Sequence, residues 1–105
     1  MKNRKELYSG RIVKLGLEQA QLPNGAEVEL EIIRHPGAAA VVPLHVDGTV
    51  TLVRQYRHAV GSEIYEIPAG VLEKGEEPTA CAARELAEEA QLKAGSLVHL
   101  STIHT

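Results

Sequence analysis

Residues 70–92 read GVLEKGEEPTACAARELAEEAQL, and this stretch predicts a loop followed by a helix. Gly75 interrupts the chain, and Pro78 is well placed at the first position of a helix. Glu76 and Glu77 suit the positive end of the helix dipole. We therefore expect a loop that gives way to a helix near Pro78.

Within this helix, apolar and acidic residues recur at helical spacing. The apolar ones are Ala83, Leu86, Ala87 and Ala90, which predict a stripe facing a core. Glu85, Glu88 and Glu89 lie roughly opposite that stripe on a helical wheel, within about 100° of one another. Either they form a solvated acidic face, eased by pairing of Arg84 with Glu88, or they bind a divalent cation.

The same stretch resembles the Nudix signature, which favours the second interpretation. That signature is Gly, five residues, Glu, seven residues, Arg-Glu-apolar, one residue, Glu-Glu, one residue, Gly and an apolar residue. The matching residues are Gly70, Glu76, Arg84, Glu85, Leu86, Glu88, Glu89 and Leu92. Gln91 replaces the final glycine, whose left-handed cap costs another residue about 1 kcal/mol. We therefore expect the helix to continue slightly towards Gly95.

The resemblance implies a Mg²⁺ site, with Mn²⁺ as an alternative metal. Glu85, Glu88 and Glu89 would be the catalytic residues and would supply carboxylate ligands, Glu85 and Glu89 being the principal ones and Glu88 binding directly or through water. Gly70 would permit a tight backbone through which the carbonyl of Ala69 points at the metal. The resemblance thus implies four metal ligands: Ala69, Glu85, Glu88 and Glu89.

Segments on either side of the helix resemble the ADP-ribose pyrophosphatase branch of the family. They are YSGRIVKL, RHPGAAAVVPL, LVRQYRHAVG and YEIPAG. The resemblance implies hydrolysis of the diphosphate of ADP-ribose, or of a related nucleoside diphosphate sugar, to AMP and a sugar phosphate. It also implies a homodimer whose N-terminal strands pack across a two-fold axis. Another nucleoside diphosphate, such as NADH, is an alternative substrate.

Five side chains are expected to bind that substrate or to support the site. Arg57 would contact the diphosphate, because a guanidinium matches phosphate oxygens bidentately, although a solvated strand arginine is the alternative. Arg54 is a second candidate, which strict alternation places on the opposite strand face unless a bulge intervenes. Glu66 would bind substrate or position a water. Glu76 and Arg84 would pair and brace the loop on the helix, or form an ordinary surface salt bridge.

Strand patterns surround the helix. Alternation over 11–22 and 26–34, joined by Pro23-Asn24-Gly25, predicts an N-terminal hairpin. The apolar run over 38–46 predicts a strand covered on both faces. Further strands are predicted over 49–57, 63–67 and 96–105, with a turn at Asp47-Gly48. The expected fold class is α+β or α/β: a Nudix-type mixed β-sheet with the Nudix loop–helix–loop, preceded by an N-terminal β-hairpin.

The chain is expected to consist of an N-terminal strand and hairpin extension over 1–35, which would form the dimer, and a Nudix domain over 36–105. Members of the ADP-ribose branch continue beyond the strand at which this sequence stops, and their general-base glutamate lies there. We therefore expect the C-terminal part of the fold to be missing or supplied by a partner chain. The alternative function is that of a catalytically incomplete Nudix fragment, acting as a nucleotide-binding or assembly protein.

Composition restricts the class of protein. The chain has 105 residues, which suffice for one small domain. Its net charge of -3 argues against nucleic-acid binding, and its apolar runs are too short to span a bilayer. The N-terminus does not resemble a secretory signal, and the one cysteine, Cys81, fits a reducing cytoplasm. We expect Cys81 to be a structural residue rather than a nucleophile.

Overall fold

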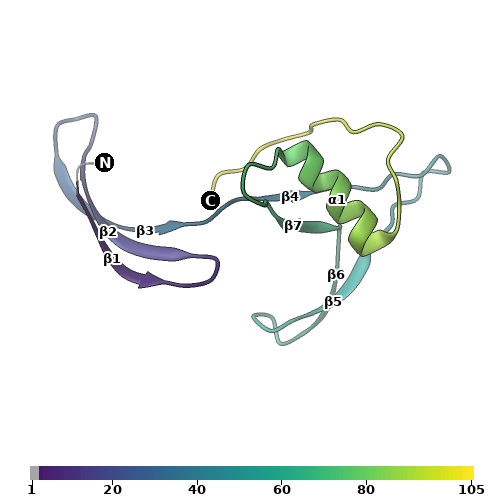
Figure 1. The fold of residues 1–105 in the computed structure, drawn as a ribbon, viewed down its shortest axis with the longest axis horizontal. Coiled ribbons are helices and arrows are strands. Elements are labelled where there is room, and N and C mark those ends of the chain that lie inside the picture. The colour runs from purple at the N-terminus through teal and green to yellow at the C-terminus, as the bar shows by residue number, and fades with distance from the viewer. Residues whose placement is uncertain (1–2) are drawn as a thin grey trace. The chain divides into compact units, whose positions relative to one another are not determined.

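The computed structural model describes residues 3–105, so the first two residues of the predicted extension over 1–35 lie outside the description. Contacts within the chain divide it into two compact units, one ending at Pro36 and the other beginning at Gly37 (Figure 1). No helix in the described part of the chain is both long enough and apolar enough to cross a membrane.

The first unit is a three-stranded antiparallel sheet in the order β1-β2-β3 (Figure 1). Its strands are β1 (Asn3–Ser9), β2 (Lys14–Gln21) and β3 (Glu27–Arg34). The predicted hairpin corresponds to β2 and β3, and β1 adds a strand that the pattern did not predict. Gly25 in the connecting turn has φ 87°, which glycine adopts without steric cost.

A charge cluster joins the three strands of this sheet. Glu18 on β2 is only 6% exposed, and both its carboxylate oxygens accept hydrogen bonds from Arg34 Nη2 at 2.8 Å. Arg4 on β1 donates to the same carboxylate. Gly16 leaves room for that guanidinium, since an added Cβ would lie 2.6 Å from Arg4 Cζ. Removing either arginine would leave a buried carboxylate less well paired, which is strongly unfavourable.

The second unit contains two strand pairs and one helix. These elements are β4 (Ala38–Ala40), β5 (Val53–Arg57), β6 (Ser62–Glu66), β7 (Ala69–Val71) and α1 (Pro78–Ala90). β4 pairs with β7 and β5 with β6, both antiparallel. Helix α1 packs against β4 and β7 (Figure 1). Cys81 and Leu86 of α1 are buried, as is Pro68, which immediately precedes β7.

The prediction of a strand over 38–46 covered on both faces was wrong. Only Ala38–Ala40 form a strand, and the side chains of Leu44 and Val46 are exposed. The turn at Asp47-Gly48 is present, but the residues that flank it pair only through an isolated bridge between Leu44 and Val50. The return strand begins at Val53 rather than at residue 49. In the described residues no second layer covers these apolar side chains, so their hydrophobicity does not extend the strand.

The predicted strand over 96–105 is also absent from the structure. These residues have no regular secondary structure, and Val98, Leu100 and Ile103 are exposed. An alternating pattern specifies a strand only where a neighbouring strand accepts and donates the backbone hydrogen bonds. Among residues 3–105 this segment has no such partner.

Helix α1 packs through a different face from the one predicted. Leu86 is buried as expected, but Ala83 and Ala87 are exposed. They line a cavity of about 580 Å³ together with Thr79, Leu92, Lys93, Ala94, Ser96 and Leu97. Glu85 and Glu89 are half-buried on the side facing β7. Strands β4 and β7 consist almost entirely of alanine and glycine, whose small side chains leave space for these carboxylates. Alanine gains little from burial, so the alanine stripe does not determine the packing.

The helix ends where the signature places its glycine, although the residue is Gln91. Gln91 adopts the left-handed conformation at φ 56° and ψ 36°, and its N–H donates to the carbonyl of Ala87. The Gln91 bond is that of an αL C-cap, and the N–H of Leu92 also donates to the carbonyl of Leu86 at 3.3 Å. The prediction that the helix continues towards Gly95 was therefore wrong, because these bonds stabilise the cap despite its steric cost.

Replacing Gln91 with glycine is expected to raise the free energy of unfolding by about 1 kcal/mol, since glycine adopts this conformation without a Cβ clash. Urea unfolding of the whole protein measures the change. As a matched control, Ala83→Gly on the exposed helix face should lower stability by about 1 kcal/mol. Equal losses in both variants would show that the cap is not strained.

Candidate metal centre

The outer edge of β7 presents backbone groups to side chains of α1. Hydrogen bonds alternate along an antiparallel pair, and the pairing of β4 with β7 directs the N–H and C=O groups of Ala69 and Val71 away from β4. The N–H of Ala69 donates to Glu89 Oε1 at 3.2 Å. The carbonyl of Val71 accepts from Arg84 Nη2 at 3.2 Å. Side chains of α1 thus pair with two of these outward-facing backbone groups, the N–H of Ala69 and the carbonyl of Val71.

Glu85 and Glu89 come together at this edge. The carboxylate of Glu89 contacts the N–H of Ala69, and that of Glu85 lies over the neighbouring Gly70, so the two carboxylates are close neighbours in one half-buried place. Burial raises the pKa of Glu85, and the contact with Glu89 raises it further. A proton or a cation between the two groups would relieve their repulsion.

Gly70 is required here for space rather than for an unusual backbone. Its φ is not positive, unlike that of Gly75. A Cβ added at Gly70 would lie 2.1 Å from Cδ and Oε1 of Glu85. The carboxylate of Glu85 therefore lies directly over the glycine. We expected the glycine to permit a tight backbone, whereas the structure shows that it leaves room for the Glu85 side chain.

Arg84 connects the loop after β7 with the acidic residues of the helix. Its Nε and Nη2 donate to the two oxygens of Glu76, both at 2.9 Å, so the contact expected between these residues is present and bidentate. Its Nη1 donates to Glu85 at 2.8 Å and to Glu88 at 3.3 Å. Glu73 Oε1 lies 3.7 Å from Nε, so one guanidinium faces four carboxylates and lowers the charge repulsion among them.

The pairing with Arg84 lowers the pKa of the Glu76 carboxyl to about 2, from an ordinary value near 4.5, with help from the N–H of Glu73. A lowered folded-state pKa contributes stability that is fully present above the ordinary pKa and is lost as the pH falls towards the folded value. We therefore expect the stability difference between the unmodified protein and Glu76→Gln to shrink between about pH 4.5 and pH 2.

Urea unfolding across that pH range tests this expectation. Glu77→Gln, on the neighbouring residue outside the pair, is the matched control for removal of one acidic charge. A Glu76→Gln difference that stays constant with pH would contradict the predicted linkage.

The donor set fits a hard divalent cation, although it is not a closed cage. No group of three His, Cys, Asp or Glu side chains within residues 3–105 converges on one point. Glu88 instead pairs with Arg84, and its side chain is 59% exposed. Glu85 and Glu89 remain as adjacent oxygen donors beside the outward-facing backbone of Ala69. Mg²⁺ commonly takes one or two protein carboxylates and completes its octahedron with waters and phosphates.

Strand β5 divides the remaining candidates between its two faces. Register with β6 is uninterrupted, so Arg54 and Arg57 lie on opposite faces as strict alternation requires. Arg57 shares its face with Gln55, which reaches α1, and donates to Glu66 Oε1 at 2.7 Å. Arg54 forms two hydrogen bonds of 3.0 Å with Glu63 on the other face. The structure does not bring Arg54 to the carboxylates of Glu85 and Glu89. The contact of Arg54 with substrate stays a prediction.

Two residues that contact Glu89 or the β7 backbone were not predicted from the sequence. Gln55 Nε2 donates to Glu89 Oε2 at 2.6 Å, and only its shared parity with Arg57 could have indicated this. The buried thiol of Cys81 donates to the carbonyl of Gly70 at 3.5 Å. Burial raises the pKa of this thiol, and nearby Glu76 raises it further, which disfavours a thiolate nucleophile.

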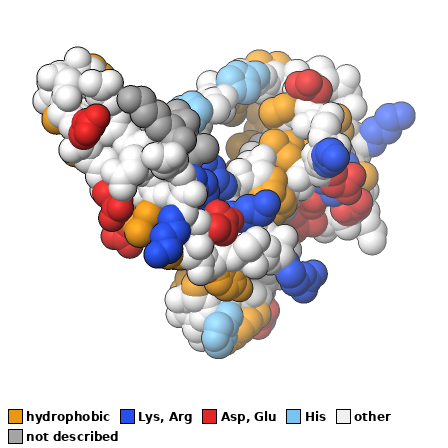
Figure 2. Space-filling model, turned by 60° about the vertical axis from the view of Figure 1, so that its left-hand side comes forward, with side chains coloured by type: hydrophobic (Ala, Val, Ile, Leu, Met, Phe, Trp, Pro, Cys, Tyr) orange, Lys and Arg blue, Asp and Glu red, His pale blue; other side chains and the backbone are white. Residues whose placement is uncertain are grey.

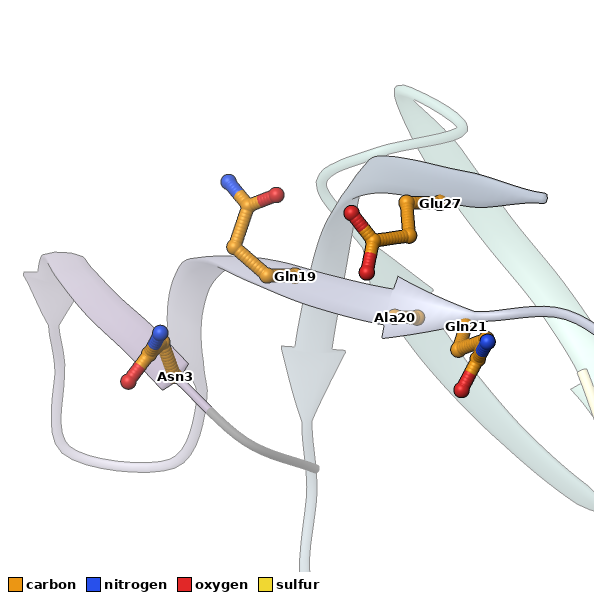
Figure 3. A pocket seen from close by; sticks show the side chains of 5 residues that line it. All are labelled: Asn3, Gln19, Ala20, Gln21 and Glu27. Atoms are coloured by element: carbon orange, nitrogen blue, oxygen red, sulfur yellow. The ribbon is translucent and has the colours of Figure 1, made fainter. Parts of the chain in front are cut away.

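The N-terminal sheet carries a separate polar cavity of about 210 Å³. Its lining residues are Asn3, Gln19, Ala20, Gln21 and Glu27, from β1, β2 and β3 (Figure 3). Figure 3 shows that the three amide groups point in different directions. They therefore do not form a convergent set of ligand contacts.

Figure 2 shows acidic, basic and apolar side chains at the surface. Many large apolar residues are exposed in both units, among them Ile33 at 63% and Tyr65 at 69%. Such exposure favours contact with further protein surface.

Comparison with known proteins places this geometry in context. The NUDIX domain model matches residues 34–105. Among curated proteins, the chain is 41% identical over 102 residues to an ADP-ribose pyrophosphatase of Bacillus subtilis (strain 168), covering 97% of the chain and 55% of that protein. It is 49% identical over 84 residues to a methanol dehydrogenase activator of Bacillus methanolicus, covering 80% of the chain and 45% of that protein.

A solved structure described as an ADP compounds hydrolase has the same fold. It superposes with a TM-score of 0.72 at 26% sequence identity, covering 90% of this chain and 52% of that one. The expected α+β architecture with the loop–helix–loop is thereby confirmed. The chain spans about half the length of the curated relatives it matches.

Proposed function

The chain belongs to the Nudix family, and from that membership we propose that the protein hydrolyses the diphosphate of ADP-ribose or of a related nucleoside diphosphate sugar. The observation that carries this proposal is the meeting of Glu85 and Glu89 at the edge of β7. Two adjacent carboxylates beside a backbone edge would suit Mg²⁺ or Mn²⁺, either of which would offset the negative charge of substrate phosphates. The substrate class is supported by two similar proteins, one named ADP-ribose pyrophosphatase and the other described as an ADP compounds hydrolase.

In the proposed reaction, water adds to one phosphorus, the bridging P–O bond breaks, and AMP and a sugar phosphate leave. A bound divalent cation would supply charge neutralisation and would lower the pKa of the attacking water. Glu85 and Glu89 would hold the cation, Glu88 would contribute directly or through water, and the carbonyl of Ala69 would be the backbone ligand. We assign no general base within residues 3–105.

Arg84 and Glu76 have a supporting role in this proposal. Their bidentate pair ties the loop between β7 and α1 to the helix, and Arg84 also holds Glu85. Gly70 leaves the space that Glu85 occupies. These contacts fix the direction of the Glu85 carboxylate before a cation binds, which reduces the ordering cost on binding.

Arg57 is the proposed diphosphate contact. It lies on the face of β5 that bears Gln55, and its side chain is 47% exposed. Its Nε bonds to Glu66 in the described part of the chain, which leaves the two amino groups for phosphate oxygens. Glu66 would orient the guanidinium and contact substrate or water, and Arg54 would contribute from the other face.

We further propose a cytoplasmic homodimer that forms through the N-terminal extension. The apolar side chains that the sheet exposes support the dimer: Leu7, Tyr8, Leu30 and Ile33. The free thiol of Cys81 supports a reducing compartment. Light scattering is expected to give twice the chain mass, and Ile33→Glu should shift the protein to monomer because it places charge in the interface. Val98→Glu, at an exposed valine outside the extension, is the control for added charge. A monomeric unmodified protein, or an unchanged Ile33→Glu dimer, would contradict this proposal.

Product analysis tests the proposed activity. The whole protein is incubated with Mg²⁺ and ADP-ribose, ADP-glucose or NADH, and the products are separated by chromatography. We expect AMP from ADP-ribose at a rate well above that from NADH. Faster release from NADH would identify the other substrate class. Absence of any product would reject hydrolysis of these diphosphates.

A second candidate function is regulation of another enzyme, favoured by the similarity to a protein named methanol dehydrogenase activator. Such a protein could bind nucleotide without rapid turnover. Nucleotide binding with no hydrolysis, combined with a changed dehydrogenase rate on addition of the protein, would favour this candidate over the first.

A further inference from the structure

Gln55 connects strand β5 to the carboxylate of Glu89 on helix α1. The two residues are 34 positions apart, and the distance from Gln55 Nε2 to Glu89 Oε2 is 2.6 Å. The other oxygen of Glu89 accepts from the N–H of Ala69 at 3.2 Å. Two neutral donors from two strands therefore fix both oxygens of one carboxylate.

The contact depends on the regular alternation of β5. Gln55 is half-buried on the face that reaches α1, whereas its neighbours Arg54 and Tyr56 are exposed on the other face. The register with β6 has no bulge, so alternate side chains of β5 point to opposite faces, and Gln55 lies on the face from which Glu89 can be reached. Glu89 in turn lies against Glu85, so Gln55 acts on the orientation of the carboxylate pair.

We propose that Gln55 is a positioning residue that orients Glu89 for cation binding, an inference that rests on the proposed function. Each carboxylate oxygen has two lone pairs, so an oxygen that accepts from Gln55 keeps one for a cation. A carboxylate already fixed by two donors loses less conformational freedom when the cation binds. Gln55 thereby favours the bound state without touching the cation.

A different role for Gln55 would be to attach the β5–β6 hairpin to the helix. In that case its removal would weaken the fold, and cation affinity would fall whatever residue occupied position 89. The positioning role instead requires that the effect of Gln55 on affinity pass through the carboxylate of Glu89. Coupling between the two positions therefore distinguishes these roles.

A double-mutant cycle on Mn²⁺ affinity measures that coupling. Free Mn²⁺ is followed by electron paramagnetic resonance, up to millimolar concentrations, for the unmodified whole protein, Gln55→Met, Glu89→Gln and the double variant. We expect Gln55→Met to weaken Mn²⁺ binding about tenfold when Glu89 is present. It should cause no further loss in the Glu89→Gln background. An equal loss in both backgrounds, or none in either, overturns the proposal.

Tyr56→Phe, on the next residue of the same strand, is the matched control and should bind Mn²⁺ like the unmodified protein. Thermal unfolding in a chelator verifies that Gln55→Met is folded, and Gln55→Ser replaces it if it is not. An unmodified protein that binds no Mn²⁺ rejects the proposed function itself. An unmodified protein that binds Mn²⁺, with Gln55→Met unchanged, rejects only the role of Gln55.

Discussion

Replacing Glu89 with glutamine is expected to lower the turnover number of the whole protein about a thousandfold. The reason is that this carboxylate would hold the cation, which would stabilise the transition state by several kcal/mol. Glutamine has nearly the same shape, and its carbonyl oxygen can still accept from Ala69 or Gln55. The fold should therefore survive. Removal of one of two adjacent negative charges also relieves repulsion with Glu85, so stability without metal should be unchanged or higher.

Steady-state hydrolysis of ADP-ribose at saturating Mg²⁺ measures this effect, and thermal unfolding in a chelator measures stability. Glu77→Gln provides a control on the same helix, because Glu77 is exposed and makes no side-chain cap bond. It should leave turnover unchanged. A Glu89→Gln variant that keeps more than about a tenth of the unmodified turnover would contradict the assigned role, because such a loss corresponds to only about 1.4 kcal/mol.

Replacing Gly70 with alanine is expected to reduce Mn²⁺ affinity and turnover about a hundredfold, comparable to the loss of a strong supporting contact. The new Cβ would overlap Cδ and Oε1 of Glu85, which would lie 2.1 Å away. The clash involves the flexible end of a side chain, so the carboxylate can rotate aside while the backbone stays in place. Stability should therefore change by less than about 1 kcal/mol even though the site is lost.

Gly95→Ala is the matched control, because a Cβ added there meets nothing within 4 Å. Mn²⁺ titration and urea unfolding are compared for both variants and the unmodified protein. If Gly70→Ala unfolded much more readily and bound Mn²⁺ normally, its glycine would serve the backbone rather than the carboxylate.

Much of the fold near the helix could be predicted from local signals. Pro78 begins α1 as expected, and the turns at Gly25 and at Asp47-Gly48 occur where their residues indicate. These features depend on conformational preferences of one or two residues. Strand lengths could not be predicted in this way, because the segments over 38–46 and 96–105 need hydrogen-bonding partners that their own patterns do not specify.

The candidate site could be predicted only in part for a related reason. Spacing along the chain identified Glu85, Glu89, Glu76 and Arg84, whose contacts are mostly within or next to the helix. The sequence could not show that Glu85 and Glu89 face β7, since the alanine stripe suggested the opposite packing. Nor could it show that Gln55 reaches Glu89, because that contact depends on the placement of a distant hairpin.

The most direct test of the central claim is to locate a bound cation on the protein. Substoichiometric Mn²⁺ is added to the ¹⁵N-labelled whole protein, and amide resonances are monitored for paramagnetic broadening. We predict that the resonances of residues 69–71 and 85–89 broaden first, and that the Glu85→Gln, Glu89→Gln double variant loses this effect. Broadening centred elsewhere, or unchanged in the double variant, would contradict a metal centre at the edge of β7.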